Sequence, residues 1–131
     1  MFVPLSEVRR EEFDWGVIGW RLVPSTGARH LVVMDVELQP GGGHDFHRHP
    51  GQEEVIIVKE GTIAQYLDQE SKILTAGDSV LVPEGVVHAS FNDDDRQTAY
   101  LQVVISPSLG GETGYGLEDV SDQEPWASLR S

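Results

Sequence analysis

The chain has 131 residues, a length typical of one domain, and carries 22 acidic against nine basic residues for a formal net charge of −13. That balance argues against DNA or RNA as a partner, because nucleic-acid binding depends on Lys and Arg side chains that neutralise phosphates. Cysteine is absent, which excludes disulfides and thiolate chemistry, and no apolar run approaches the roughly 20 residues that cross a bilayer.

Residues 1–15 are predicted to form an N-terminal arm. They lack the basic and apolar stretches of a signal peptide, so we expect a cytoplasmic protein without a membrane partner. Within the arm, the run from Arg9 to Glu12 is expected to form one helical turn or a docking arm.

Residues 16–107 are predicted to form a single all-β domain, because apolar runs of strand length alternate with turns that contain Gly, Asn or Asp. The clearest alternation lies between His30 and Leu38. Short strands at this spacing are typical of a sandwich or barrel. The predicted strands are Gly16 to Pro24, His30 to Leu38, Glu53 to Lys59, Thr62 to Leu67, Ser79 to Pro83, Val86 to Asn92 and Thr98 to Ser106.

The final segment, residues 108–131, is acidic and rich in glycine, and it lacks the alternation of the preceding strands. Such a composition does not favour a packed core of its own. We therefore expect a C-terminal tail that is either an irregular wrap or loose.

Three of the five histidines lie in two short segments. His47 and His49 are two residues apart, so on an extended backbone both imidazoles point to the same side and can reach one metal ion. Glu54 opens the next strand, and His88 follows a turn at the start of another strand. Three neutral imidazoles and a carboxylate suit one divalent transition metal ion per chain, such as Fe, Mn, Ni or Zn, rather than Ca or Mg.

These segments resemble the two motifs of the cupin superfamily. The first motif is matched by Gly41, His47, His49, Glu54 and Gly61 at its characteristic spacing, and the second by Gly77, Pro83, Gly85, His88 and Asn92. The resemblance implies a small single-domain cupin, a jelly-roll or double-stranded β-helix barrel with the metal inside. It also implies that Glu54, which stands seven residues before Gly61, is the ligand rather than Glu53.

Further polar residues are candidates for the surroundings of the metal. His30 has the parity of Val32 and Met34 and is expected either at the barrel mouth or as a structural histidine. Parity leaves open whether Tyr66, or instead Tyr100 and Gln102, faces the cavity. His44 stands at an odd spacing from His47, and we expect it to be a loop residue rather than a ligand.

The ligand set is compatible with several functions. Four protein ligands leave two positions open on a six-coordinate ion, which favours an enzyme that acts on a small organic molecule by dioxygenase-type chemistry. The resemblance also allows isomerase or lyase activity. A non-catalytic module that binds a small molecule or a metal is the alternative, because the fold does not fix the function.

The strand from Glu53 to Lys59 bears on assembly. If Glu54 points into the barrel, Val55 and Ile57 point outward, where apolar side chains need a cover. Either the N-terminal arm or a second chain provides it, and we expect a homodimer because two-fold dimers are the commonest closed assembly.

Overall fold

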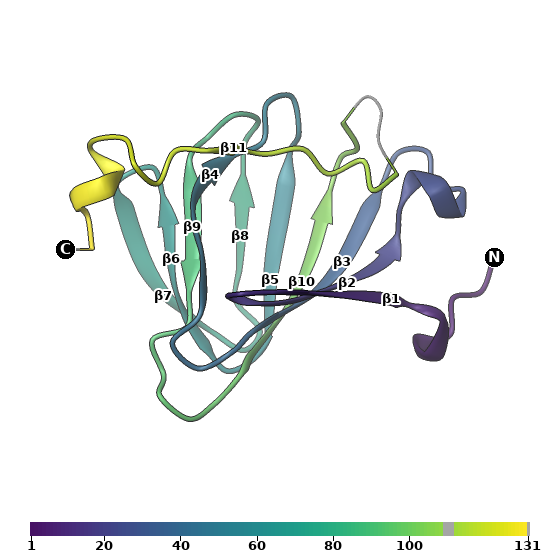
Figure 1. The fold of residues 1–131 in the computed structure, drawn as a ribbon, viewed down its shortest axis with the longest axis horizontal. Helices are drawn as coiled ribbons and strands as arrows, with labels where there is room; N and C mark the ends of the chain where they lie inside the picture. Colours follow the sequence, from purple (N-terminus) through teal and green to yellow (C-terminus); the bar gives the residue numbers. More distant parts are fainter. Residues whose placement is uncertain (109–111, 131) are drawn as a thin grey trace.

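A computed structural model of the protein describes residues 1–108 and 112–130, and most of its regular structure is β-strand (Figure 1). None of the helical turns in this part of the chain is long or apolar enough to cross a membrane. The strands are β1 (Arg9–Phe13), β2 (Gly16–Leu22), β3 (Val32–Leu38), β4 (Gly43–Arg48), β5 (Glu54–Glu60), β6 (Thr62–Leu67), β7 (Glu70–Thr75), β8 (Ser79–Val82), β9 (His88–Phe91), β10 (Ala99–Ile105) and β11 (Glu118–Asp119). The short 3₁₀ turns among the described residues are η1 (Leu5–Glu7), η2 (Pro24–Thr26) and η3 (Trp126–Ser128).

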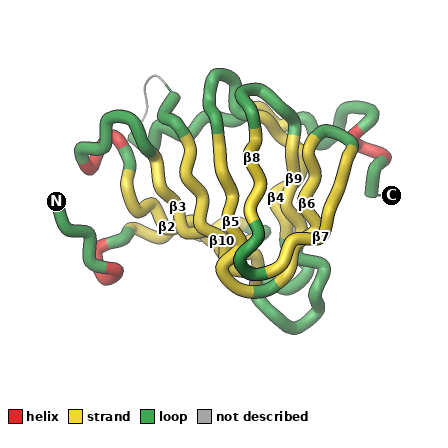
Figure 2. The backbone as a smooth tube through the Cα atoms, turned by 180° about the vertical axis from the view of Figure 1, so that it is seen from behind, coloured by secondary structure: helices red, strands yellow, loops and turns green. Residues whose placement is uncertain are grey.

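The strands form two antiparallel sheets that face each other (Figures 1 and 2). The larger sheet has the order β1-β2-β3-β10-β5-β8, and the smaller has the order β11-β4-β9-β6-β7. Some neighbouring strands are far apart in sequence, as in β10 between β3 and β5, so closure of the barrel depends on long-range pairing. The all-β, two-sheet barrel expected from the sequence is confirmed.

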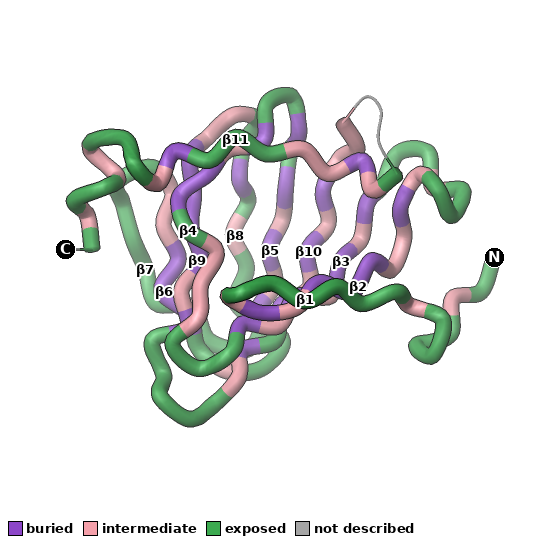
Figure 3. Tube along the Cα trace, in the orientation of Figure 1, coloured by how far each residue is buried: buried purple, intermediate pink, exposed green. Residues whose placement is uncertain are grey.

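The core lies between the two sheets. Figure 3 shows the buried residues on strands of both sheets, whereas β1 is exposed throughout. In β3 burial alternates at every position from Val32 to Leu38, as the period of two predicts. The buried apolar residues of this cluster are Ile18, Trp20, Val23, Val32, Met34, Val36, Leu38, Ile56, Val58, Ile63, Val82, Ala99, Leu101, Val103 and Ile105.

The C-terminal segment covers the outer face of the smaller sheet. Val120 is buried there with Phe46, Val87 and Ala89, and Trp126 and Leu129 pack against them. β11 also pairs with β4, so the segment adds an edge strand to the sheet. Residues 109–111 and 131 of the predicted tail lie outside the described residues.

Four strands fall outside the predicted set, and each lies at or near a sheet edge. Residues 9–12 form part of β1, paired with β2, and not a helical turn as one of our expectations had it. Every residue of β1 is exposed, and β7 is almost as exposed, so neither shows the apolar alternation by which strands are recognised. The missed strands are β1, β4, β7 and β11.

Asn92 fastens the end of β9 to two other segments. Its side chain is buried, and its Nδ2 donates hydrogen bonds to the carbonyl oxygens of Leu38 and Gln97 at 2.9 and 2.8 Å. Asn92→Ala would leave these carbonyls without a donor, so we expect the free energy of unfolding to fall by about 2–3 kcal/mol. Urea denaturation measures this, with the exposed Asp95→Ala as a control that should change stability by less than about 0.5 kcal/mol. An equal, small effect of both substitutions would contradict the role of Asn92.

Candidate metal centre

Four predicted ligands converge at one end of the barrel interior. His47 lies in β4 and pairs in register with His88 at the start of β9, while His49 follows β4 and Glu54 begins β5. Gly85 makes the turn before His88 with a positive φ of 72°, a conformation that favours glycine. Its N–H donates to the carbonyl oxygen of His49 at 3.2 Å, which fixes the two histidine segments to each other.

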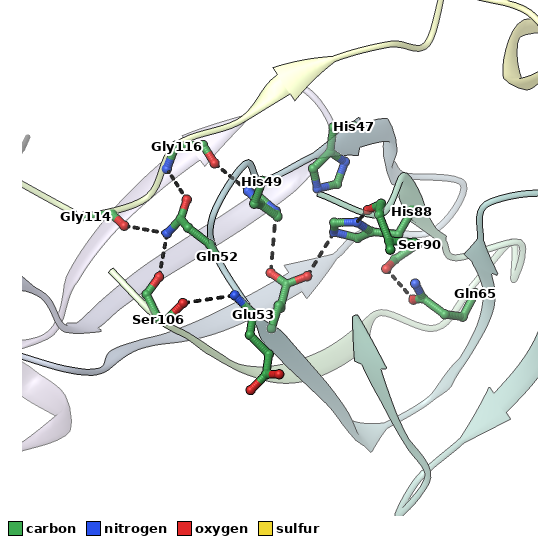
Figure 4. A network of polar contacts seen from close by, with 12 residues as sticks. His47, His49, Gln52, Glu53, Gln65, His88, Ser90, Ser106, Gly114 and Gly116 are labelled. Carbon is green, nitrogen blue, oxygen red and sulfur yellow. Dashed lines mark hydrogen bonds and ion pairs between the residues drawn. The ribbon is translucent and has the colours of Figure 1, made fainter. Parts of the chain in front are cut away.

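The ligand atoms of the three histidines lie within 4.8 Å of one another. Glu54 reaches the same point from the opposite sheet: its Oε1 is 2.9 Å from Nε2 of His88, and its Oε2 is 3.6 Å from Nε2 of His49 (Figure 4). All four side chains are buried. The carboxylate of Glu53 points away from this cluster, as Figure 4 shows.

Backbone carbonyls set the tautomer of each imidazole. Nδ1 of His47 lies 2.7 Å from the carbonyl oxygen of Asp45. Nδ1 of His49 lies 2.5 Å from the carbonyl oxygen of Gly116, and Nδ1 of His88 lies 2.9 Å from that of Val86. A carbonyl oxygen only accepts hydrogen bonds, so each Nδ1 carries the proton and each Nε2 offers a lone pair. Hydrogen bonds of this kind orient metal-binding histidines.

The atoms that face the centre of the cluster lack partners. Nε2 of His49, Nε2 of His88 and Oε1 of Glu54 are fully buried without a hydrogen bond. A lone pair of Nε2 and a carboxylate oxygen at 2.9 Å repel each other unless a positive charge lies between them. Three imidazole nitrogens and one carboxylate oxygen therefore fit a divalent transition metal ion.

The imidazoles of His47 and His49 are in the protonation state that a metal requires. Burial lowers the pKa of His47 well below the usual 6.5, and burial also lowers the pKa of His49. Both side chains are thus neutral at neutral pH.

His44 belongs to the site, contrary to the expectation of a loop histidine. It lies in β4, and its ring stacks on the ring of His47 with 3.7 Å between centroids and on that of Trp15 with 4.7 Å. The pairing of β4 with β9 shifts register between residues 44 and 47, and such a bulge lets residues at an odd spacing share one face. Burial, followed by the nearby His88 and His49, lowers the pKa of His44 to about 4.

A small cavity of about 30 Å³ adjoins the cluster, enough for about two water molecules. Its walls are mainly apolar, and the polar groups beside the ligands are His44, Ser90 and Tyr115. Tyr115 lies on the C-terminal segment, whose residues show no periodic pattern, and the centroid of its ring is 4.8 Å from that of His49. The lining residues are Trp15, Ile18, Met34, Val36, Leu38, His44, His47, Glu54, Ile56, His88, Ser90, Leu101, Val103 and Tyr115.

The structure places the other four sequence candidates outside this cavity. His30 is exposed in the loop before β3. Tyr66 packs with Phe46 on the outer face of the smaller sheet. Tyr100 and Gln102 alternate with buried residues of β10 and so lie on its outer face, where Gln102 donates to Met34 O at 2.8 Å.

Gln52 joins the ligand loop to the C-terminal segment (Figure 4). It is 1% exposed, and its Nε2 donates to the carbonyl oxygens of Ser106 at 2.6 Å and Gly114 at 2.8 Å. Its Oε1 accepts from the N–H of Gly116 at 3.0 Å, and the carbonyl of Gly116 is the acceptor for His49. The position of one metal ligand therefore depends on a segment more than 60 residues away in sequence.

Comparisons with known proteins agree with this architecture. The family model described as "Cupin domain" matches residues 34–105. A germin-like protein from Morus alba is 34% identical over 92 residues, which cover 66% of this chain and 44% of that protein. The chain thus matches less than half the length of such curated relatives.

Solved structures share the fold at low sequence identity. The polyketide cyclase RemF from Streptomyces resistomycificus superposes with a TM-score of 0.75 and 22% identity, over 98% of this chain and 97% of that one. A predicted oxalate decarboxylase from Thermotoga maritima gives a TM-score of 0.72 and 19% identity, over 81% of this chain and 98% of that one.

The first prediction concerns the carboxylate ligand. Glu54→Ala should reduce metal bound per chain at least tenfold, because it removes one ligand oxygen from the buried cluster. Glu53→Ala is the matched control, since its carboxylate lies outside the cluster. Metal content after dialysis measures both, and equal loss in the two variants would contradict the assignment.

The second prediction concerns Gln52. Gln52→Ala removes the hydrogen bonds that hold residues 114–116 against His49, so metal affinity should fall about 10–100-fold. Limited proteolysis should also cut residues 112–120 faster in this variant. Arg48→Ala, which removes an exposed ion pair with Glu118, is the control and should leave metal affinity within about threefold. Unchanged affinity in Gln52→Ala would refute the coupling.

The third prediction concerns pH. A proton competes with the metal for Nε2, and burial lowers the pKa of His47 and His49 below 6.5, so competition begins at lower pH than for an ordinary histidine. Metal occupancy should be the same at pH 8 and pH 6 and should fall only on further acidification. Equilibrium dialysis with a fixed free metal concentration tests this, and complete loss by pH 6 would contradict it.

Proposed function

The chain belongs to the cupin domain family, and from that premise we propose that it is a metal-dependent enzyme acting on a small, uncharged organic molecule. The observation that carries the proposal is the set of buried, unpartnered atoms on His49, His88 and Glu54 that face one point. His47 completes the proposed ligand set. A divalent transition metal bound there would supply Lewis acidity and, for Fe or Mn, activation of O₂.

The cavity walls favour an uncharged substrate. Among the described residues, neither Lys nor Arg lines the cavity, and most of the wall is aliphatic or aromatic. A phosphorylated or dicarboxylate substrate could bind the metal through some of its oxygens. Its remaining anionic group would then lie against apolar side chains, which is unfavourable. An enol, a diketone or a phenolic ring can place one or two oxygens at the metal, and because the cavity of about 30 Å³ is smaller than such a molecule, the walls at Met34, Val36 and Leu101 would have to move apart to admit its carbon skeleton.

Three side chains are placed to orient such a substrate. The Tyr115 hydroxyl makes no hydrogen bond within the described residues, and burial raises the pKa of this phenol well above 10, so it is a free donor. Ser90 Oγ donates to Gln65 Oε1 at 2.6 Å, which leaves its lone pairs for a substrate hydroxyl. His44 adds a neutral imidazole to the same wall.

Dioxygenase-type chemistry is the reaction we favour. Four protein ligands leave two positions of a six-coordinate ion for substrate and O₂, and the apolar wall excludes water from both. A cyclase or other lyase reaction without O₂ is the second candidate, and the observation that favours it is the match to RemF over nearly the whole of both chains. A non-catalytic metal or small-molecule binding module is the third.

One experiment separates these functions. Protein purified without chelator is analysed for metal and screened for O₂ uptake and product formation with small enols, diketones and phenols. We expect Fe or Mn, together with O₂ uptake that Glu54→Ala abolishes and Glu53→Ala retains. Product formation without O₂ uptake would favour the lyase hypothesis over the dioxygenase hypothesis. A stably folded chain that binds no transition metal would refute the proposal.

A further inference from the structure

A hollow of about 300 Å³ lies where an edge of one sheet faces an edge of the other. β8 is the last strand of the larger sheet, β7 is the last strand of the smaller sheet, and residues of both strands line the hollow. We call this line between the two edges the seam. A volume of this size is at the lower end of the range for small-molecule sites in proteins.

The inner side of β7 faces the hollow. Ile63 of β6 belongs to the core and pairs with Leu74 of β7, and Gln65 of β6 pairs with Lys72. Because paired residues point to the same face of a sheet and faces alternate along a strand, Leu74 and Lys72 share the inner side of β7 with Glu70. This side therefore presents one apolar residue and two residues of opposite charge to the seam.

The floor of the hollow is aliphatic. Leu67 of β6, Leu74 of β7 and Val80 of β8 line it, and all three pack against the core. Among the described residues that line the hollow, none is aromatic. The floor thus suits an aliphatic group of a ligand better than an aromatic ring, which would gain from stacking.

Glu70 and Lys72 lie exposed at the mouth of the hollow. Within residues 1–108 and 112–130 neither side chain makes an ion pair or a hydrogen bond, either with the other or with a third residue. Residues two apart on a strand are separated by about 6.5–7 Å, so the two charges can contact different groups of one small molecule.

Gln65 lies between the hollow and the metal cavity (Figure 4). It is buried, and its Oε1 accepts a hydrogen bond at 2.6 Å from Oγ of Ser90, which lines the cavity. Its Nε2 donates to the carbonyl oxygen of Tyr66 at 3.1 Å, and an amide nitrogen has two protons. The second N–H is therefore available to an acceptor in the hollow, since buried polar groups normally have partners.

We propose that the seam binds an α-amino acid with an aliphatic side chain, such as leucine, at a site separate from the metal centre. The Lys72 ammonium pairs with the carboxylate of the amino acid, which also accepts the second N–H of Gln65, the cross-strand partner of Lys72. The Glu70 carboxylate pairs with the α-ammonium group, and the aliphatic side chain lies on the floor of the hollow.

The two charges favour a zwitterion over a simple acid or a simple amine. An acid without an ammonium group would bring a second carboxylate toward Glu70, and an amine without a carboxylate would bring a second cation toward Lys72. A zwitterion satisfies both side chains and has no net charge, so the field of a chain of net charge −13 does not repel it. None of these residues is a proposed metal ligand, so the proposal stands or falls independently of the proposed function.

A ligand series tests the site by nuclear magnetic resonance of the ¹⁵N-labelled protein as purified. Leucine should cause saturable amide shifts in β6, β7 and β8, with a dissociation constant of about 1 mM or less. 4-Methylpentanoate lacks the ammonium group of leucine, and 3-methylbutylamine lacks its carboxylate. Each should bind at least about fivefold more weakly than leucine, because it loses one ion pair and meets one like charge.

Two variants of exposed residues assign the contacts. Lys72→Gln should weaken leucine binding about fivefold without weakening 3-methylbutylamine, which has no carboxylate to lose. Glu70→Gln should likewise weaken leucine without weakening 4-methylpentanoate. Lys59→Gln, which removes the other lysine of the chain, exposed on β5, is the matched control and should leave the affinity for leucine within about twofold.

Three results would overturn the proposal. The first is the absence of saturable shifts up to about 20 mM leucine, a concentration far above the expected dissociation constant. The second is a set of shifts centred on the histidine cluster instead of on β7 and β8. The third is equal binding of leucine by Lys72→Gln and Lys59→Gln, which would leave Lys72 only as a charge that protects a sheet edge from aggregation.

Discussion

The site depends on three hydrogen bonds from imidazole Nδ1 to backbone carbonyls. They fix the protons of His47, His49 and His88 on the outward nitrogens, so the three Nε2 lone pairs face a carboxylate of Glu54 in a buried space. Such an arrangement of acceptors is unfavourable without a cation. The folded barrel holds these acceptor atoms together at a cost to its free energy of unfolding. A bound metal would remove their repulsion and so stabilise the folded state.

The sequence predicted that His47, His49, His88 and Glu54 come together, because their positions follow from local geometry and motif spacing. The i, i+2 relation of His47 and His49 required only an extended strand. His44 was misjudged because a β-bulge, which leaves no simple signal in residue types, brings an odd spacing onto one face. Tyr115 and Gln52 were missed because their roles arise from contacts between residues more than 60 positions apart in sequence. The strands β1 and β7 were missed because exposed edge strands lack an apolar side.

The outer faces of the two sheets differ in what covers them. The C-terminal segment covers the smaller sheet with Val120, Trp126 and Leu129, and on its way across the barrel it contributes Tyr115 to the cavity and the carbonyl of Gly116 to His49. The outer face of the larger sheet has no comparable cover among the described residues. The C-terminal segment of the same chain thus contributes to the surroundings of the proposed metal centre.

The central claim is that one metal ion binds Nε2 of all three histidines and an oxygen of Glu54. The most direct measurement is a crystal structure of the metal-loaded protein with anomalous diffraction recorded at the absorption edge of that metal. The account predicts one strong anomalous peak per chain, about 2.0–2.3 Å from each of the four ligand atoms. An anomalous peak elsewhere in the chain, with the histidine cluster metal-free, would contradict it.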